Sequence, residues 1–102
     1  MAAYTFTSEM WLWQSNGGTA WTFITLPHDV SDEIEGTVPV KDGFGSVKVD
    51  VKIGATEWST SLFPSTEYDS YILPVKKLVR VKENLDHGDQ VNVTVSPVFG
   101  SD

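Results

Sequence analysis

The 102-residue sequence contains no cysteine, and it has only 7 lysine and arginine residues against 14 aspartate and glutamate residues. Without cysteine, the chain can form no disulfide, no thiolate nucleophile and no cysteine-ligated zinc or iron–sulfur site. The formal net charge of −7 makes nucleic acid an unfavourable partner, because such binding draws much of its affinity from basic residues that neutralise phosphates. The charge by itself indicates solubility rather than a particular ligand.

Long apolar runs are also missing. No segment reaches the roughly 20 apolar residues that are needed to cross a bilayer. The first ten residues, MAAYTFTSEM, have neither the basic stretch nor the apolar run of a signal peptide. We therefore expect no membrane contact and a cytoplasmic location. The length suits a single domain over residues 1–102 with one hydrophobic core.

Alternating apolar and polar residues are the main structural signal that is present, and the segment SVKVDVKI at 46–53 shows it most clearly. Its valines and isoleucine predict a buried face, and its Ser, Lys and Asp residues a solvated one. The predicted strands cover residues 4–13, 20–26, 46–53, 58–63, 70–73 and 91–95. Short helices are predicted over 28–36 and about 75–84, with a turn at 15–18 and a loop at 37–45.

Proline residues mark the predicted ends of several elements. We expect Pro27 and Pro64 to end the strands before them, and Pro74 to open the second helix. The elements read as two ββαβ halves, each with a strand–Leu–Pro–helix junction, which indicates an internal pseudo-repeat. The alternative is that such junctions recur by chance. The predicted fold is mainly β, a compact six-stranded barrel with two short helices; an open six-stranded sheet with helices on one face is the alternative.

Several ordered motifs resemble one family. The strings WTFITLP, GFGSVKV, WSTSLFP, YILPVKKLVR and LDHGDQVNVTV lie in the range from about Phe6 to Val95. They are similar to a small bacterial family of domains of unknown function, found alone or fused to segments called YdeI/OmpD-associated. The resemblance implies a barrel of the double-split kind, an architecture shared with transition-state-regulator-like DNA-binding proteins. It implies no activity, and a shared fold alone does not support a DNA-binding function.

Four of the seven basic residues fall between positions 76 and 82, in the second predicted helix. On a helical wheel, Lys76, Lys77 and Arg80 lie opposite an apolar side formed by Val75, Leu78, Val79 and Leu85. Lysines in a first turn are disfavoured by the helix dipole, by roughly 0.3–1 kcal/mol each. A bound anion would remove this conflict, and Ser59 and Ser61, or Thr60, on the neighbouring strand could add hydroxyl groups.

The simpler interpretation of the basic residues is a solvated helix face. Acidic residues of the first predicted helix would then neutralise it, the candidates being Asp29, Asp32, Glu33 and Glu35. The two interpretations make different predictions about where the two helices lie.

The aromatic residues form two groups in the sequence, Trp11, Trp13 and Trp21, and then Trp58, Phe63, Tyr68 and Tyr71. Core packing is the expected role for most of them, because large aromatic side chains dominate the cores of small barrels. Trp11 and Trp13 are the exception. They share a strand face with polar residues, so we expect them to cover a barrel end or to form a partner surface, including that of a homodimer.

Catalytic and metal-binding patterns are weak. The two histidines lack His-x₃-His or His-Glu-x₂-His spacing, and no Gly-x-Ser-x-Gly nucleophile motif is present. We expect no metal and no cofactor. The predicted function is a non-catalytic binding module for a small anionic ligand or an acidic partner. The alternatives are an interaction domain that self-associates and, with less support, an enzyme of unrecognised type or a nucleic-acid binder.

Overall fold

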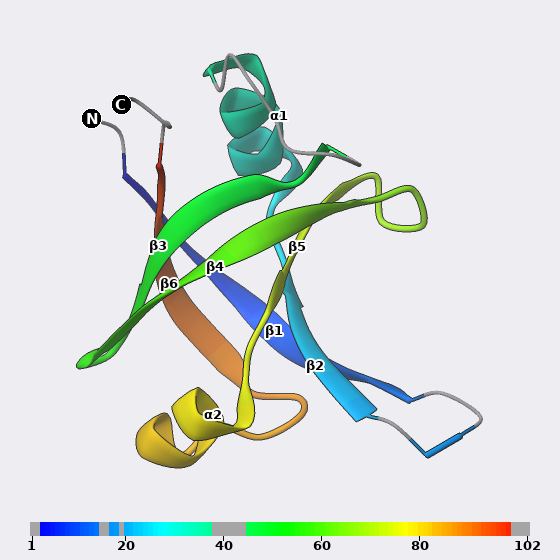
Figure 1. Ribbon diagram of the computed structural model, residues 1–102, viewed down its shortest axis with the longest axis vertical. Helices are drawn as coiled ribbons and strands as arrows, with labels where there is room; N and C mark the ends of the chain where they lie inside the picture. Colours follow the sequence, from blue (N-terminus) through cyan, green and yellow to red (C-terminus); the bar gives the residue numbers. More distant parts are fainter. Residues whose placement is uncertain (1–2, 15–16, 19, 38–44, 99–102) are drawn as a thin grey trace.

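The computed structural model describes residues 3–14, 17–18, 20–37 and 45–98 of the chain, and these contain six strands and two helices (Figure 1). The elements in chain order are β1 (Tyr4–Gln14), β2 (Ala20–Thr25), α1 (His28–Thr37), β3 (Val47–Ile53), β4 (Thr56–Ser65), β5 (Ser70–Pro74), α2 (Lys77–Glu83) and β6 (Gln90–Pro97). The predicted order of strands and helices is confirmed. Residues 15, 16 and 38–44, where the sequence predicts parts of a turn and a loop, lie outside the described residues.

The strands close into an antiparallel barrel in the order β1-β2-β5-β4-β3-β6. Strand β6 makes the closure because it pairs with β1 on one side and with β3 on the other. The two helices lie at opposite ends of the barrel (Figure 1). The predicted barrel is therefore confirmed, and the alternative of an open sheet with both helices on one face is wrong. Closure gives every strand a partner on each side, which removes the exposed sheet edges of an open sheet.

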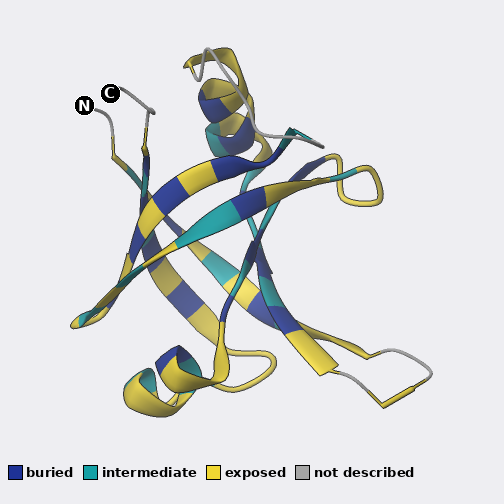
Figure 2. Ribbon diagram, in the orientation of Figure 1, coloured by how far each residue is buried: buried dark blue, intermediate teal, exposed yellow. Residues whose placement is uncertain are grey.

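Side-chain alternation places one face of each strand inside the barrel. Along β3 the buried valines and isoleucine alternate with exposed Lys48, Asp50 and Lys52, and the bands of Figure 2 show this pattern. Burial of each such aliphatic side chain contributes roughly 1.5–3 kcal/mol. The core also draws on the other strands and on both helices, through residues such as Phe6, Met10, Ile24, Ile34, Leu62, Leu73, Val79 and Val93.

Strand β4 does not end at Pro64, as the sequence predicted, but continues to Ser65. Pro64 pairs with Tyr71 of β5. The backbone groups of Tyr71 point away from this pair, because its N–H donates to Ser31 Oγ at 3.0 Å and its carbonyl accepts from the Leu26 N–H at 3.0 Å. No ladder hydrogen bond is needed from Pro64, so a residue without an N–H is tolerated inside the strand.

Helix α2 begins at Lys77, later than predicted, and Pro74 is the last residue of β5 rather than part of the helix. The Val75 N–H donates to the Thr22 carbonyl at 2.8 Å, so the chain keeps contact with β2 beyond the proline. Lys76 is extended, with φ −73° and ψ 160°. The helix ends at Asn84, which takes the left-handed conformation with φ 55°, and asparagine is one of the few residues that adopt it readily.

Only part of the predicted apolar side of α2 is buried. Val75 and Val79 are buried and Leu85 packs against the core, whereas Leu78 is 57% exposed. The prediction for Leu78 is wrong because a helix of this length covers the end of the barrel through a single buried side chain, Val79. Within the described part of the chain, neither helix is long and apolar enough to span a bilayer.

Candidate functional site

The basic residues of the predicted anion site surround the start of α2. Lys76 is the N-cap residue, without a side-chain capping hydrogen bond, and Lys77 is the first helical residue. Both side chains are exposed. Arg80 is half-buried, and its Nε donates to the Val75 carbonyl at 3.3 Å. Part of the Arg80 guanidinium is therefore already engaged by the chain segment that leads into its own helix.

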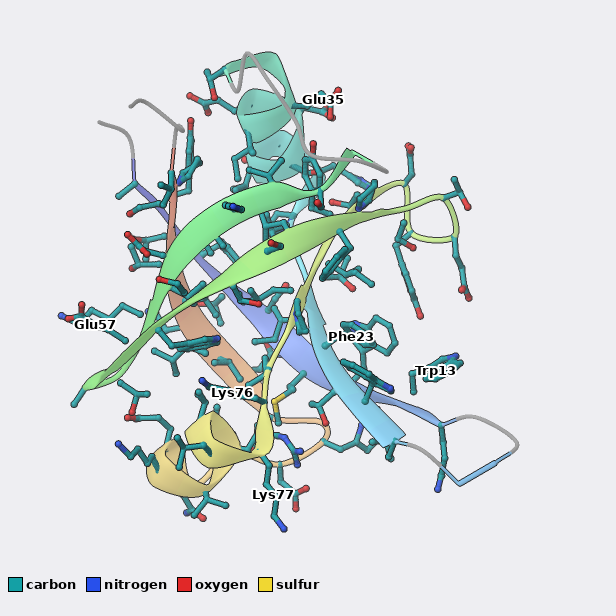
Figure 3. The ribbon with its side chains drawn as sticks, viewed as in Figure 1. Trp13, Phe23, Glu35, Glu57, Lys76 and Lys77 are labelled. Atoms are coloured by element: carbon teal, nitrogen blue, oxygen red, sulfur yellow. The ribbon has the colours of Figure 1, made fainter. Side chains whose placement is uncertain are left out.

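The acidic residues of α1 do not neutralise this basic face. Figure 3 shows Glu35 at one end of the molecule and Lys76 and Lys77 at the other. The predicted neutralisation by α1 is wrong because barrel closure separates the two helices along the longest axis of the molecule (Figure 1). Within the described residues, the Lys76 ammonium has no hydrogen-bond or ion-pair partner. This leaves its charge available to a ligand.

The predicted hydroxyl residues of β4 line two cavities. Ser59 and Thr60 line a cavity of about 300 Å³ together with Lys76. Ser61 lines a different cavity, of about 420 Å³, together with Lys48 of β3, and Ser59 and Thr60 line this cavity as well. Neither of these two cavities includes Lys77 or Arg80. Of the five predicted anion-site residues, Lys76 therefore shares one of these cavities with Ser59, and Ser59 shares the other with Ser61.

Ser59 also has an intramolecular partner. Its hydroxyl donates to Asp50 Oδ1 at 2.6 Å, across the pairing of β4 with β3. A serine hydroxyl has a single proton, so Ser59 cannot donate to an anion while it keeps this bond. Thr60 has no side-chain hydrogen bond with another described residue, which makes its hydroxyl the better donor in this cavity.

The largest aromatic feature is a row of rings on the outer face of the β1–β2 hairpin. The strand register places Trp11 opposite Phe23 and Trp13 opposite Trp21. All four side chains point outward, because the alternating residues Met10 on β1 and Ile24 on β2 are buried. Cross-strand aromatic pairs of this kind stabilise a hairpin by roughly 0.2–1 kcal/mol each. The register thus turns two alternating sequence patterns into one aromatic surface.

The rings are packed on one another and held in place. The ring centroids of Trp11 and Phe23 are 5.0 Å apart, and Trp11 lies at the same distance from Tyr68 of the β4–β5 connection. Trp21 and Phe23 are nearly parallel, with centroids 6.3 Å apart. Trp11 Nε1 donates to Thr25 Oγ1 at 2.7 Å, which fixes the orientation of the indole. Trp11 is therefore the anchored centre of the group.

These rings line a groove of about 440 Å³, which we call the aromatic groove. Its lining residues are Trp11, Trp13, Trp21, Phe23, Phe63, Ser65, Glu67, Tyr68, Ile72 and Pro74. Figure 3 shows the side chains of Trp13 and Phe23 on the outside of the barrel, beside β2. The volume falls within the range of pockets that bind small molecules.

The predicted core role is wrong for three of these aromatic residues. Trp21 is 51% exposed, and Phe63 and Tyr68 are also exposed. Trp13, which the sequence placed on the surface, is 49% exposed. Tyr71 lies in the core, and Trp58 is half-buried against it. The two aromatic groups of the sequence merge, because Phe63 and Tyr68 close the groove against the tryptophans of the hairpin. The interface role predicted for Trp11 and Trp13 stays a prediction.

The aromatic groove adjoins the cavity that contains Lys76. Trp21, Phe63 and Pro74 line both spaces. Glu67 lines only the aromatic groove, and Lys76 lines only the adjoining cavity. The combined surface is therefore mainly aromatic in the groove and mixed with hydroxyl residues in the adjoining cavity, with the Glu67 carboxylate in the first part and the Lys76 ammonium in the second.

A further cavity, which is polar, lies beside α1, and hydrogen bonds among its lining residues give it a structural role. The Tyr71 hydroxyl donates to Glu35 Oε1 at 2.7 Å, and the Ser70 hydroxyl donates to the Leu26 carbonyl at 2.7 Å. Burial raises the pKa of Tyr71 above its ordinary value of 10.0, and the hydrogen bond to Glu35 and its negative charge raise it further. The phenol stays protonated at neutral pH and ties α1 to β5.

The histidines contribute no recognisable site. His28 Nε2 lies 3.1 Å from the Tyr68 carbonyl, so it connects α1 to the β4–β5 connection beside the aromatic groove. The backbone N–H of His87 donates to the carboxylate of its neighbour Asp86 at 2.8 Å, as in a turn. Among the described residues, no group of three or more His, Asp or Glu side chains is placed to hold a metal ion.

Comparisons with known proteins identify the family. No curated protein matches the chain. One family profile, described as a domain of unknown function (DUF1905), matches residues 6–95. The matched segment begins within β1 and ends within β6, so it includes most of these two strands and the whole of the six elements between them. The chain therefore belongs to the DUF1905 family of domains of unknown function.

Proposed function

We propose that the domain is a non-catalytic binding module that holds an organic anion, or the acidic group of a partner, with its apolar body in the aromatic groove. The negative group would pair with Lys76 in the adjoining cavity. The observation that carries this proposal is the junction at Trp21 and Phe63, which joins an exposed aromatic surface to the Lys76 ammonium, a group without an ion-pair partner among the described residues. The proposal therefore assigns the anion to Lys76 alone, and no longer to Lys76, Lys77 and Arg80 together.

Magnitudes decide which part of the surface supplies the affinity. An exposed ion pair to a lysine is worth only about 0.2–1 kcal/mol. Covering aromatic surface contributes roughly 25 cal/mol for each Å² of apolar area that leaves water. Trp13 and Trp21, each about half exposed, therefore supply most of the binding free energy. Lys76 selects the charge of the ligand, and the Thr60 hydroxyl can donate a hydrogen bond to it.

Phenyl phosphate is a suitable probe, because it combines one aromatic ring with one anionic group. We expect its addition to shift the amide and indole resonances of Trp21 and the backbone resonances around Lys76. The Lys76→Gln variant should bind about fivefold more weakly, which corresponds to the loss of about 1 kcal/mol. Benzyl alcohol, an uncharged ligand of similar shape, should bind both proteins equally.

Lys77→Gln is the matched control, because Lys77 is the adjacent exposed lysine and lies outside the cavity that holds Lys76. Its effect on phenyl phosphate should stay below about twofold, since it alters only the screened long-range field. Equal weakening by the two lysine variants would show a diffuse charge effect and overturn the assignment to Lys76. A spectrum of the wild-type protein unchanged by the probe would overturn the proposal as a whole.

Self-association is the second candidate function, supported by the exposure of Trp13 and Trp21 on one face of a hairpin. Large aromatic side chains are enriched at the centres of protein interfaces. Sedimentation velocity over a wide concentration range would reveal a dimer, and Trp13→Ser should abolish it. A monomer at the highest concentration would exclude this function, while the ligand-binding proposal would be unaffected.

We also propose that the barrel is of the double-split type with pseudo-duplicated ββαβ halves. The strand order supports this. Exchanging β1 with β4, β2 with β5 and β3 with β6 turns the cyclic order β1-β2-β5-β4-β3-β6 into itself read in the opposite direction. The same exchange swaps α1 with α2 at the two ends of the barrel. A fold arising from two unrelated halves would have no reason to obey this symmetry.

A bacterial origin and a cytoplasmic location stay predictions. The absence of cysteine and the acidic composition support the second of them. Fractionation of cells that express the full-length protein would test it, and recovery in a secreted or membrane fraction would contradict it.

A further inference from the structure

The aromatic groove has a chemical feature that the proposed anion at Lys76 does not use. Among its ten lining residues, six carry aromatic rings and one, Glu67, carries a charge. We propose that this part of the groove binds a methylated ammonium group carried by a small molecule. The inference rests on the groove as the ligand-binding surface of the proposed function, but it concerns the opposite sign of charge and a different residue.

The rings provide the attraction. A cation within about 6 Å of the face of an aromatic ring is attracted by the negative charge of that face, and tryptophan is the strongest of the three aromatic residues. The groove brings together Trp11, Trp13 and Trp21 with two phenylalanines and Tyr68. The contacts of Trp11 with Phe23 and with Tyr68 are tilted by 33° and 40°. Neighbouring rings are therefore inclined to one another instead of forming one flat wall, so several rings can contact a rounded group.

Glu67 provides charge complementarity. Its side chain is exposed at the groove and forms no hydrogen bond or ion pair with another residue of the described ranges. The formal net charge of −7 adds a long-range field that attracts cations to the domain. Lys76 lines the adjoining cavity and is absent from the groove lining. The local charge in the groove is therefore that of one carboxylate beside aromatic faces.

The small number of side-chain hydrogen-bond acceptors favours a methylated over a bare ammonium. Ser65 and Glu67 are the groove's hydrogen-bonding side chains apart from the Tyr68 hydroxyl and the indole N–H groups, and indole N–H groups only donate. The Ser65 Oγ already accepts from the Tyr68 N–H at 3.4 Å. A bare ammonium has three N–H donors to satisfy on leaving water, whereas a quaternary ammonium has none. Its methyl groups also gain from contact with the rings.

Choline and 3,3-dimethylbutan-1-ol separate charge from shape, because the second replaces the quaternary nitrogen of choline by carbon. Each would be titrated into the wild-type protein while tryptophan fluorescence and the resonances of Trp13, Trp21 and Tyr68 are followed. Choline should bind about five- to thirtyfold more tightly than its neutral isostere, the range expected for a cation over aromatic faces. Ethanolamine, with a bare ammonium, should bind more weakly than choline.

Matched variants locate the site. Glu67→Gln should weaken choline binding about two- to fivefold, as expected for one partly solvated charge pair, and should leave the neutral isostere unaffected. Asp69→Asn is the control, because Asp69 belongs to the same connection but lines the polar cavity beside α1 instead. Asp69 has a positive φ of 52°, and asparagine tolerates that conformation. This variant should bind choline as the wild type does.

The outcomes distinguish this inference from the proposed function. Equal affinity for choline and its isostere, or no response of the groove to choline, would overturn the ammonium site. If phenyl phosphate still bound in a Lys76-dependent manner, the proposed function would stand without the ammonium site. Choline binding that depends on Glu67 and persists in Lys76→Gln would support the ammonium site, even if phenyl phosphate did not bind.

Discussion

Replacement of Tyr71 by phenylalanine tests how α1 is held to the barrel and how this contact responds to pH. Tyr71 is buried, and its hydroxyl donates to Glu35 Oε1 at 2.7 Å. Its backbone bonds to Ser31 and Leu26 do not involve the hydroxyl, so Tyr71→Phe leaves them intact. The variant therefore removes one hydrogen bond without changing the pairing of β5 or creating a cavity larger than one oxygen atom.

The expected loss at neutral pH is about 1 kcal/mol in the free energy of unfolding. A hydrogen bond to a charged group contributes about 1.5–3 kcal/mol when both partners are buried. Glu35 is exposed, so water can replace the phenol at the carboxylate and reduce the cost. The ring itself keeps its place in the core and its contribution to hydrophobic burial.

The effect of pH follows from the raised pKa of Tyr71. In the unfolded chain the phenol loses its proton near pH 10.0, whereas burial and Glu35 raise the pKa in the folded state. The folded state then binds more protons than the unfolded state, so stability falls as the pH rises. The phenol's contribution to the free energy of unfolding is fully present below the pKa of the unfolded state, and it is lost as the pH rises through the pKa of the folded state. At pH 11 the free energy of unfolding of the wild type should have fallen by about 1.4 kcal/mol.

Urea unfolding followed by tryptophan fluorescence at several pH values from neutral to about 11 would measure this. The wild type should be more stable than Tyr71→Phe by about 1 kcal/mol at neutral pH, and this difference in the free energy of unfolding should disappear by about pH 11. Tyr68→Phe is the control, because Tyr68 is exposed, and its difference from the wild type should stay small throughout. A Tyr71→Phe difference that is constant across the whole pH range would refute the reasoning, since it would mean that the phenol titrates alike in both states.

Two further substitutions test single polar groups. The Tyr4 hydroxyl is buried without a hydrogen-bond partner among the described residues, so Tyr4→Phe should leave the free energy of unfolding unchanged or raise it by up to about 1 kcal/mol. Urea unfolding would measure this, and a clear loss of stability would mean that the hydroxyl has a partner. Thr25→Val leaves Trp11 Nε1 without its acceptor, so it should lower the free energy of unfolding by about 1 kcal/mol. It should also weaken phenyl phosphate binding, measured from the resonance shifts of Trp21. Unchanged binding would show that the hydrogen bond of Trp11 does not shape the aromatic groove.

Much of the fold could be read from local patterns. The alternation of valines in β3 and β6 requires one buried and one solvated face, whatever the strands pair with. The strand and helix boundaries at proline residues did not follow from local patterns. Pro64 lies inside β4 and Pro74 ends β5, because the hydrogen bonds of the neighbouring strands decide whether a missing N–H matters. That information is not local to the proline.

The candidate site was only partly predictable. Sequence reasoning selected Trp11 and Trp13 as surface residues but assigned Trp21 to the core, although Trp21 and Phe23 alternate with buried residues in the same way. That alternation, combined with the hairpin register, is the signal that could have found the aromatic groove. Sequence reasoning also treated the basic residues as one patch, whereas the structure brings only Lys76 to the cavity beside the groove.

The sequence by itself determined the order of the elements, the inward faces of β3 and β6 and the absence of cysteine chemistry, because these depend on residue type and on spacing over a few positions. Only the tertiary structure decided that α1 and α2 lie at opposite ends, that Phe63 and Tyr68 meet the tryptophans of the hairpin, and that Glu67 and Lys76 lie in adjoining spaces. These relations join residues that are distant in the chain. They follow from strand register and barrel closure, which local patterns do not specify.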